Sequence, residues 1–111
     1  MVMPIPRSML PHSAELKHIS AADKWGKAEY TVTALEYIRI EPIYARSFLL
    51  AANEPKAKAR LYFDAVNSLP RGISFETGDT IVFGGEEFVI TEVKPFSADM
   101  AAIHHYEVML G

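Results

Sequence analysis

The chain contains no cysteine among its 111 residues. Disulfide stapling, thiol catalysis and zinc–thiolate sites are therefore excluded. It also has no apolar run long enough to span a bilayer, so we expect no membrane partner. The first eleven residues are apolar, but Pro4, Pro6 and Pro11 interrupt them, and no charged region precedes a continuous apolar stretch. We therefore expect no signal peptide, and synthesis in the cytoplasm.

An excess of basic charge is also missing, since the formal net charge is −3. This balance gives no sequence-wide attraction to nucleic acid or to anionic membrane. The charges are unevenly placed, however. Every charged residue between Gly72 and Val93 is acidic, whereas Lys56, Lys58 and Arg60 form a small basic cluster. The two groups can be solvated surfaces, or the acidic and basic sides of a subunit that associates head to tail.

Motifs for nucleophilic catalysis and phosphate binding are missing as well. No serine lies in a Gly-x-Ser-x-Gly elbow, and the Gly84-Gly85 pair lacks the spacing and the lysine of a phosphate loop. His104 and His105 are adjacent on a predicted strand, so their side chains should project to opposite faces and fail to chelate one ion. We therefore expect no enzyme activity, no cofactor and no metal. A metal-dependent enzyme using His18, His104, His105 and nearby carboxylates is an alternative.

What the chain does contain is a series of segments with the alternating pattern of β-strands. They lie at 12–20, 29–43 and 59–66, in two arms of a hairpin within 73–93, and at 103–110. This pattern predicts a mainly β fold, a small antiparallel β-barrel or sandwich of about six strands. Residues 1–12 are expected to form an extended, proline-rich arm, and residues 13–111 a single β-barrel domain.

Three segments interrupt this pattern. Residues 29–43 are long for one strand, so we expect a bend or bulge near Ala34-Leu35. Around 44–57 we expect an inserted long loop or short helix. A further loop is expected around Pro95-Phe-Ser-Ala-Asp99. Trp25 lies in a predicted loop, where its ring can contact a partner or fold back over one end of the core.

The hairpin within 73–93 is the best-defined part of the sequence. With Gly85-Glu86 as the turn residues, Phe83 faces Phe88, and the turn is of type II′. A Gly84-Gly85 turn would instead set Phe83 against Glu86, so the first register is preferred. That register assigns four apolar side chains to the core: Ile81, Phe83, Phe88 and Ile90. It leaves an acidic rim outside, formed by Glu76, Asp79, Glu86 and Glu87.

An ordered set of short motifs resembles the minor capsid proteins of phages and prophages. The matching pieces are Ile5-Pro-Arg-Ser-Met-Leu-Pro-His-Ser13, Leu16-Lys-His18, Trp25-Gly-Lys27, Arg39-Ile-Glu-Pro42, Leu61-Tyr-Phe-Asp64, Asn67-Ser-Leu-Pro-Arg-Gly-Ile-Ser-Phe75, Gly78-Asp-Thr-Ile81 and His105-Tyr-Glu107. Together they cover nearly the whole chain. The segment from Ile43 to Lys58 departs most from the family, in which this region is more polar.

The resemblance implies a non-enzymatic structural protein at the head–tail junction of a tailed phage, made in the bacterial cytoplasm. Proteins of this kind look similar to head-completion (stopper) proteins, small barrels that form a ring and help to close the DNA channel. The implied partners are portal, adaptor and tail-completion proteins, other copies of the chain in a ring, and packaged DNA. The isolated subunit is expected to be able to remain monomeric. By analogy, the channel or partner loop would contain Tyr44, Arg46, Phe48, Leu49, Leu50, Lys56 and Lys58.

A second hypothesis is a small β-barrel that binds single-stranded nucleic acid or a peptide. Such a module needs interleaved aromatic and basic side chains on one face. Tyr37 shares a strand parity with Arg39, and Arg60 shares one with Tyr62. A binding face lined by these four residues is the distinguishing prediction of this hypothesis.

Overall fold

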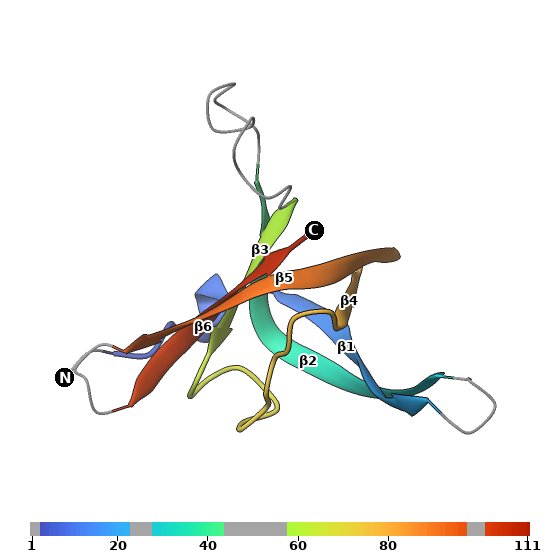
Figure 1. Ribbon diagram of the computed structural model, residues 1–111. Helices are drawn as coiled ribbons and strands as arrows, with labels where there is room; N and C mark the ends of the chain where they lie inside the picture. Colours follow the sequence, from blue (N-terminus) through green and yellow to red (C-terminus); the bar gives the residue numbers. More distant parts are fainter. Residues whose placement is uncertain (1–2, 23–27, 44–57, 98–101) are drawn as a thin grey trace, which may run out of the picture.

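In a computed structural model, which describes residues 3–22, 28–43, 58–97 and 102–111, the chain forms a closed antiparallel barrel of six strands (Figure 1). The strands are β1 (His12–Ala22), β2 (Ala28–Pro42), β3 (Ala59–Asp64), β4 (Thr80–Phe83), β5 (Glu86–Ser97) and β6 (Ile103–Leu110). Their order around the barrel is β1-β2-β3-β6-β5-β4, and β4 closes on β1. The predicted fold class and strand number are confirmed. The described residues contain no α-helix, only a 3₁₀ turn, η1 (Arg7–Met9), and no helix long and apolar enough to cross a membrane.

The core fills the barrel with aliphatic side chains and one aromatic ring. Because side chains alternate along a strand, each strand contributes its inward-facing residues. The buried cluster consists of Leu16, Leu35, Ile38, Ile40, Ala59, Leu61, Phe63, Ile81, Ile90, Val108 and Leu110. Phe75, in the loop before β4, packs its ring edge against Phe63 at a centroid distance of 5.2 Å.

The β4–β5 hairpin turns at Gly84-Gly85, so the predicted Gly85-Glu86 turn is wrong. Ile81 pairs with Phe88, and Phe83 pairs with Glu86. Both glycines have positive φ, 60° and 82°, as a type I′ turn requires. The predicted faces nevertheless hold, since the true register differs by two residues and only an odd shift exchanges the faces. Ile81 and Ile90 are buried, and Phe83 and Phe88 pack against the core.

The predicted irregularity in β2 lies at Tyr37, two residues beyond Leu35. Tyr37 has a positive φ of 55°, and the pairing with β1 shifts register between Ser13↔Glu36 and His12↔Ile38. The extra residue exchanges the faces of the strand, which is why Leu35 and Ile38 are both buried although they differ in parity. Tyr30 and Val32 therefore lie outside the barrel rather than on the face of Ile38 and Ile40.

The first part of the predicted 95–99 loop is instead part of β5, where Pro95 pairs with Tyr106 of β6, and Ala98 and Asp99 lie outside the described residues. The pairing of β5 with β4 ends at Val89. At Pro95 the strand neighbour of β5 is therefore β6 alone. A proline is tolerated there, since the missing N–H can lie on the unpaired edge. β6 is in turn paired with β3 from His105 to Leu110, so this part of β5 lies beside the β3–β6 pair (Figure 1).

Candidate interaction surfaces

Most of the predicted partner-loop residues lie outside the described part of the chain. These are Trp25 and, in 44–57, Tyr44, Arg46, Phe48, Leu49, Leu50 and Lys56. Lys58 is described and exposed. Its N–H donates to the carbonyl oxygen of Leu110 at 2.6 Å, and its own carbonyl accepts from the N–H of Ile43 at 2.8 Å. The segment 44–57 therefore leaves and rejoins the barrel at hydrogen-bonded neighbours at the ends of β2 and β3.

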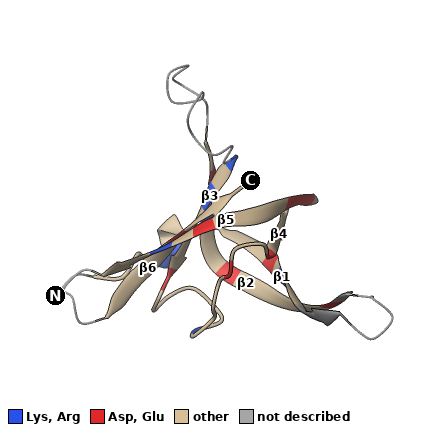
Figure 2. Cartoon of the chain, viewed as in Figure 1, with Lys and Arg blue, Asp and Glu red and all other residues tan. Residues whose placement is uncertain are grey.

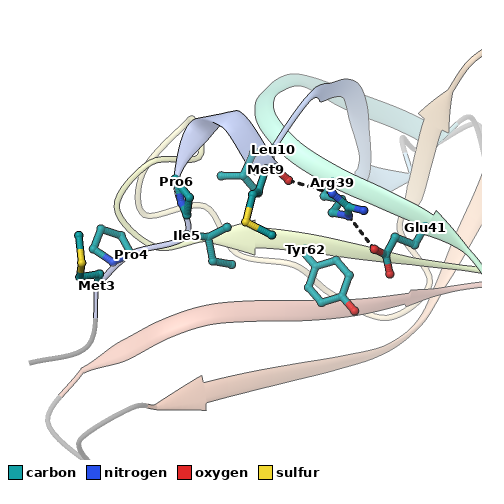
Figure 3. A pocket seen from close by; sticks show the side chains of 9 residues that line it. All are labelled: Met3, Pro4, Ile5, Pro6, Met9, Leu10, Arg39, Glu41 and Tyr62. Carbon is teal, nitrogen blue, oxygen red and sulfur yellow. Dashed lines mark hydrogen bonds and ion pairs between the residues drawn. The ribbon is translucent and has the colours of Figure 1, made fainter.

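The N-terminal arm lies on the outer surface of its own barrel. Figure 3 shows Met3, Pro4, Ile5, Pro6, Met9 and Leu10 over side chains of β2 and β3. Together they line a cleft of about 510 Å³ whose barrel wall is formed by Arg39, Glu41 and Tyr62. Leu10 is only 1% exposed, yet it is not part of the barrel core. Burial of Leu10, together with the hydrogen bond that the N–H of Ile5 donates to Asp64, therefore fixes the arm to the barrel.

A buried carboxylate anchors this arm. Asp64 is fully buried at the end of β3, and its oxygens accept hydrogen bonds from the N–H groups of Ile5 at 2.9 Å, Val66 at 3.0 Å and Asn67 at 2.8 Å. The side-chain amide of Asn67 donates in turn to the carbonyl of Ile5 at 2.8 Å. The Asp64 carboxylate thus joins the arm, through Ile5, to the turn after β3, through Val66 and Asn67.

The turn after β3 also supports the bulge in β2. The hydroxyl of Ser68 donates to the carbonyl of Tyr37, and Glu36 and Leu69 exchange two backbone hydrogen bonds of 3.0 and 2.9 Å. The guanidinium of Arg7 lies 4.0 Å from the centre of the Tyr37 ring, a cation–π contact. The positive φ of Tyr37 is thus held by both the arm and the turn.

The basic and aromatic face of the second hypothesis is largely occupied by internal contacts. Arg39 donates to Glu41 at 2.6 Å, and Nε of Arg60 lies 3.6 Å from Oε1 of Glu107. Arg60 also donates to the hydroxyl of Tyr62 at 3.3 Å, and this contact is the main cause of its raised pKa. Because both cations lie beside carboxylates, the face offers little net positive charge to a phosphate backbone.

His104 and His105 were predicted to be kept apart, and this is wrong. Their Nδ1 atoms lie 2.9 Å from each other, and their rings meet edge to face. The cause is a register shift between β5 and β6, in which Phe96 pairs with His105 and Ser97 with Ile103. The extra residue, His104, breaks the alternation of faces. Nε2 of His104 lies 2.8 Å from the Met3 carbonyl, so that nitrogen is the donor of this hydrogen bond.

A cluster not foreseen from the sequence joins β1 to the turn before β4. Both oxygens of Asp79 lie 2.9 Å from Nδ1 of His18, and Oε2 of Glu76 lies 3.6 Å from the same nitrogen. Asp79 is 6% exposed, so its assignment to an exposed acidic rim is wrong. The hydrogen bond and the charge of Asp79 raise the pKa of His18. In the β1–β4 register Lys17 pairs with Thr80, which sets the next residues, His18 and Asp79, opposite each other.

The outer face of β5-β4-β1-β2 carries exposed apolar side chains. One cross-strand row contains Val89, Thr80, Lys17 and Val32, because these residues pair in succession across the four strands. Ile19 pairs with Tyr30 two residues further along β1. Ile19, Tyr30, Val32 and Val89 are each between 48% and 59% exposed. We call these four residues the apolar face. Ile19, Tyr30 and Val32 are neighbours on it, whereas Thr80 and Lys17 separate them from Val89. Contiguous exposed apolar surface is typical of interaction sites.

Acidic and basic residues lie at different places around the barrel. Figure 2 shows acidic residues at the tip of the β4–β5 hairpin and basic residues at the start of β3. At the tip, Glu86 and Glu87 are exposed, and Lys17 forms an ion pair with Glu87 at 3.2 Å. The charge separation predicted from the sequence is thus partly reduced by contacts within the chain.

Comparison with known proteins gives one family. The model of a family described as "Minor capsid protein" matches residues 6–110, which is nearly the whole chain. Neither the curated proteins nor the solved structures contain a significant match.

Proposed function

The chain belongs to the minor capsid protein family and is a structural protein of the phage virion, and from this premise we propose that it acts at the head–tail junction. There it would serve as a head-completion subunit, forming a ring with copies of itself between the portal or adaptor and the tail. The segment 44–57 would approach the DNA channel and help to close it.

The observation that best supports this role is the uncovered apolar face. The arm covers the outer surface of β2 and β3 around Tyr62, whereas no described residue covers the apolar face. A ring subunit needs a surface that meets a different surface of its neighbour. The apolar face can meet such a surface through Tyr30 and Val32 of β2, which pair there with Ile19 and Lys17 of β1.

The anchoring of residues 44–57 supports the channel role. Both ends of this segment are fixed by the hydrogen bonds that Lys58 makes with Ile43 and Leu110. A loop carried by two paired strands can be placed accurately relative to a ring axis even when its own residues adapt to a partner. The basic residues Arg46, Lys56 and Lys58 would give such a loop affinity for the DNA backbone.

Replacing Tyr30 and Val32 with threonine tests the apolar face. Threonine retains a high β propensity, so the barrel should remain folded while the exposed apolar area falls. We expect the amount of the double variant in virions to be at least about tenfold lower than that of the wild type, because a few apolar anchors dominate most interfaces. Quantitative immunoblotting of purified particles measures this amount, with the portal protein as the reference for particle number.

Val66→Thr is the matched control, because Val66 is 49% exposed but lies in the turn after β3, away from the apolar face. It should be incorporated as the wild type is. Equal incorporation of the double variant and the control would show that the apolar face does not contact the virion.

A further inference from the structure

The cluster formed by His18, Glu76 and Asp79 has the composition of a metal site. It offers one imidazole nitrogen and two carboxylate groups, and its three ligand atoms all lie within 4.8 Å of one another. Mixed nitrogen and oxygen donors suit borderline ions such as Zn²⁺ better than Mg²⁺, which prefers oxygen and water. We propose that this cluster binds a divalent transition-metal ion, with Zn²⁺ as the best match. This inference does not depend on a role at the head–tail junction.

The barrel positions the three groups before any ion binds. His18 lies on β1, where it pairs with Thr31 of β2 and directly follows Lys17, the last residue of β1 that pairs with β4. Glu76 and Asp79 lie at the two ends of a turn, in which the N–H of Asp79 donates to the carbonyl of Glu76 at 3.2 Å. Gly78 has a φ of +92°, as the third position of a type II turn requires. The backbone of Asp79 is held further by the N–H of Ile90, at 2.8 Å.

The distances fit an ion after a small expansion. Ligand atoms about 2.0–2.2 Å from a tetrahedral zinc ion lie about 3.3–3.6 Å from one another. Nδ1 of His18 lies 3.6 Å from Glu76 and 2.9 Å from Asp79. Moving His18 and Asp79 apart by about 0.5 Å therefore opens the space for the ion. A fourth position would be left for water or a partner's ligand.

The carboxylate of Asp79 provides a second, independent argument. It is nearly buried, and among the described residues His18 is its one ionic partner. Its two oxygens are equidistant from a single nitrogen, although one N–H can point at only one of them. Burial of a carboxylate is costly unless charge and hydrogen bonds compensate it. An imidazolium supplies one positive charge against the two carboxylates, whereas a divalent cation supplies two.

Access to the site is open on one side. The side chain of His18 is 40% exposed and that of Glu76 is 63% exposed, while Asp79 forms the buried floor. An ion can enter from solvent and meet Glu76 first. Lys17, the nearest cation along β1, is paired with Glu87 and does not compete for these carboxylates.

The test is zinc titration of the untagged protein after chelator treatment. Isothermal titration calorimetry should give one Zn²⁺ per chain, and zinc should raise the thermal unfolding midpoint because it binds the folded state. Mg²⁺ at the same concentration should do neither. Co²⁺ should bind at the same site and report its coordination by visible absorption.

Three variants locate the site. Glu76→Gln and His18→Gln should each weaken zinc binding at least about tenfold. Glu76 is exposed, so its variant should stay folded even if His18→Gln does not. His105→Gln is the control, since His105 belongs to a separate His–Glu pair with Glu107. Absence of saturable zinc binding, equal affinity in all variants, or loss of binding only in His105→Gln would each overturn the proposal.

Discussion

Replacing Asp64 with alanine should cost the protein about 3–4 kcal/mol of its free energy of unfolding. The reason is that the Asp64 carboxylate accepts three backbone hydrogen bonds at a fully buried position. Removal of the acceptor leaves the N–H groups of Ile5, Val66 and Asn67 without a partner, and each such loss costs about 1–3 kcal/mol. Since domains of this size are stable by about 5–15 kcal/mol, the change should be large.

Urea unfolding followed by circular dichroism measures the loss. Asp64→Asn keeps one acceptor oxygen and should lose less stability than Asp64→Ala. Glu86→Ala removes an exposed carboxylate at the hairpin tip and should change stability by less than about 0.5 kcal/mol. If Asp64→Ala is as stable as Glu86→Ala, the arm is not anchored as described.

Hydrogen exchange separates the arm from the barrel. In Asp64→Ala the amide of Ile5 should exchange faster, because it loses its acceptor. The exchange rate of the Ile40 amide should not change, because this amide donates to Nδ1 of His12, at 3.0 Å, and not to Asp64. Equal acceleration at both amides would indicate global unfolding rather than release of the arm.

A phage that carries a stop codon in this gene should produce packaged heads that lose their DNA and carry no tails. A head-completion subunit acts after packaging, so capsid assembly itself should continue. We expect the infectious titre to fall by several orders of magnitude, and electron microscopy of the lysate to show emptied, tailless heads. Expression of the wild-type chain from a plasmid should restore the titre.

Complementation with a variant in which a glycine–serine linker replaces residues 44–57 distinguishes the two proposed roles, joining the head to the tail and closing the DNA channel. Because Ile43 and Lys58 remain paired, the barrel should fold and enter the particle. The heads should nevertheless retain less DNA. Full complementation by this variant would exclude a channel role for the segment, and a tailed, infectious stop-codon phage would exclude the junction role altogether.

Much of the fold follows from local patterns in the sequence. Alternation identified the strands, and the faces of Ile81, Phe83, Phe88 and Ile90 came out correctly. The hairpin register did not, because registers that differ by two residues bury the same face. The choice between them depends on the turn, and the two positive-φ glycines outweighed the pairing of Phe83 with Glu86.

The bulges and the His18 cluster depend on contacts that no local pattern contains. Tyr37 adopts its positive φ against Ser68 and Arg7, which are 31 and 30 residues away in the sequence. His18 meets Asp79 only because β4 closes the barrel on β1. Asp79 was therefore placed with the exposed acids, although the closed barrel buries it. Long-range strand pairing was the missing information in each case.

Locating the protein in the virion tests the proposed function most directly. Cryo-electron microscopy of the head–tail junction, without imposed capsid symmetry, should show a ring of six-stranded barrels between the portal or adaptor and the tail. The apolar face should lie against a neighbouring subunit, and residues 44–57 should point toward the channel. Density for this barrel on the capsid shell, or its absence from the junction of infectious particles, would contradict the proposal.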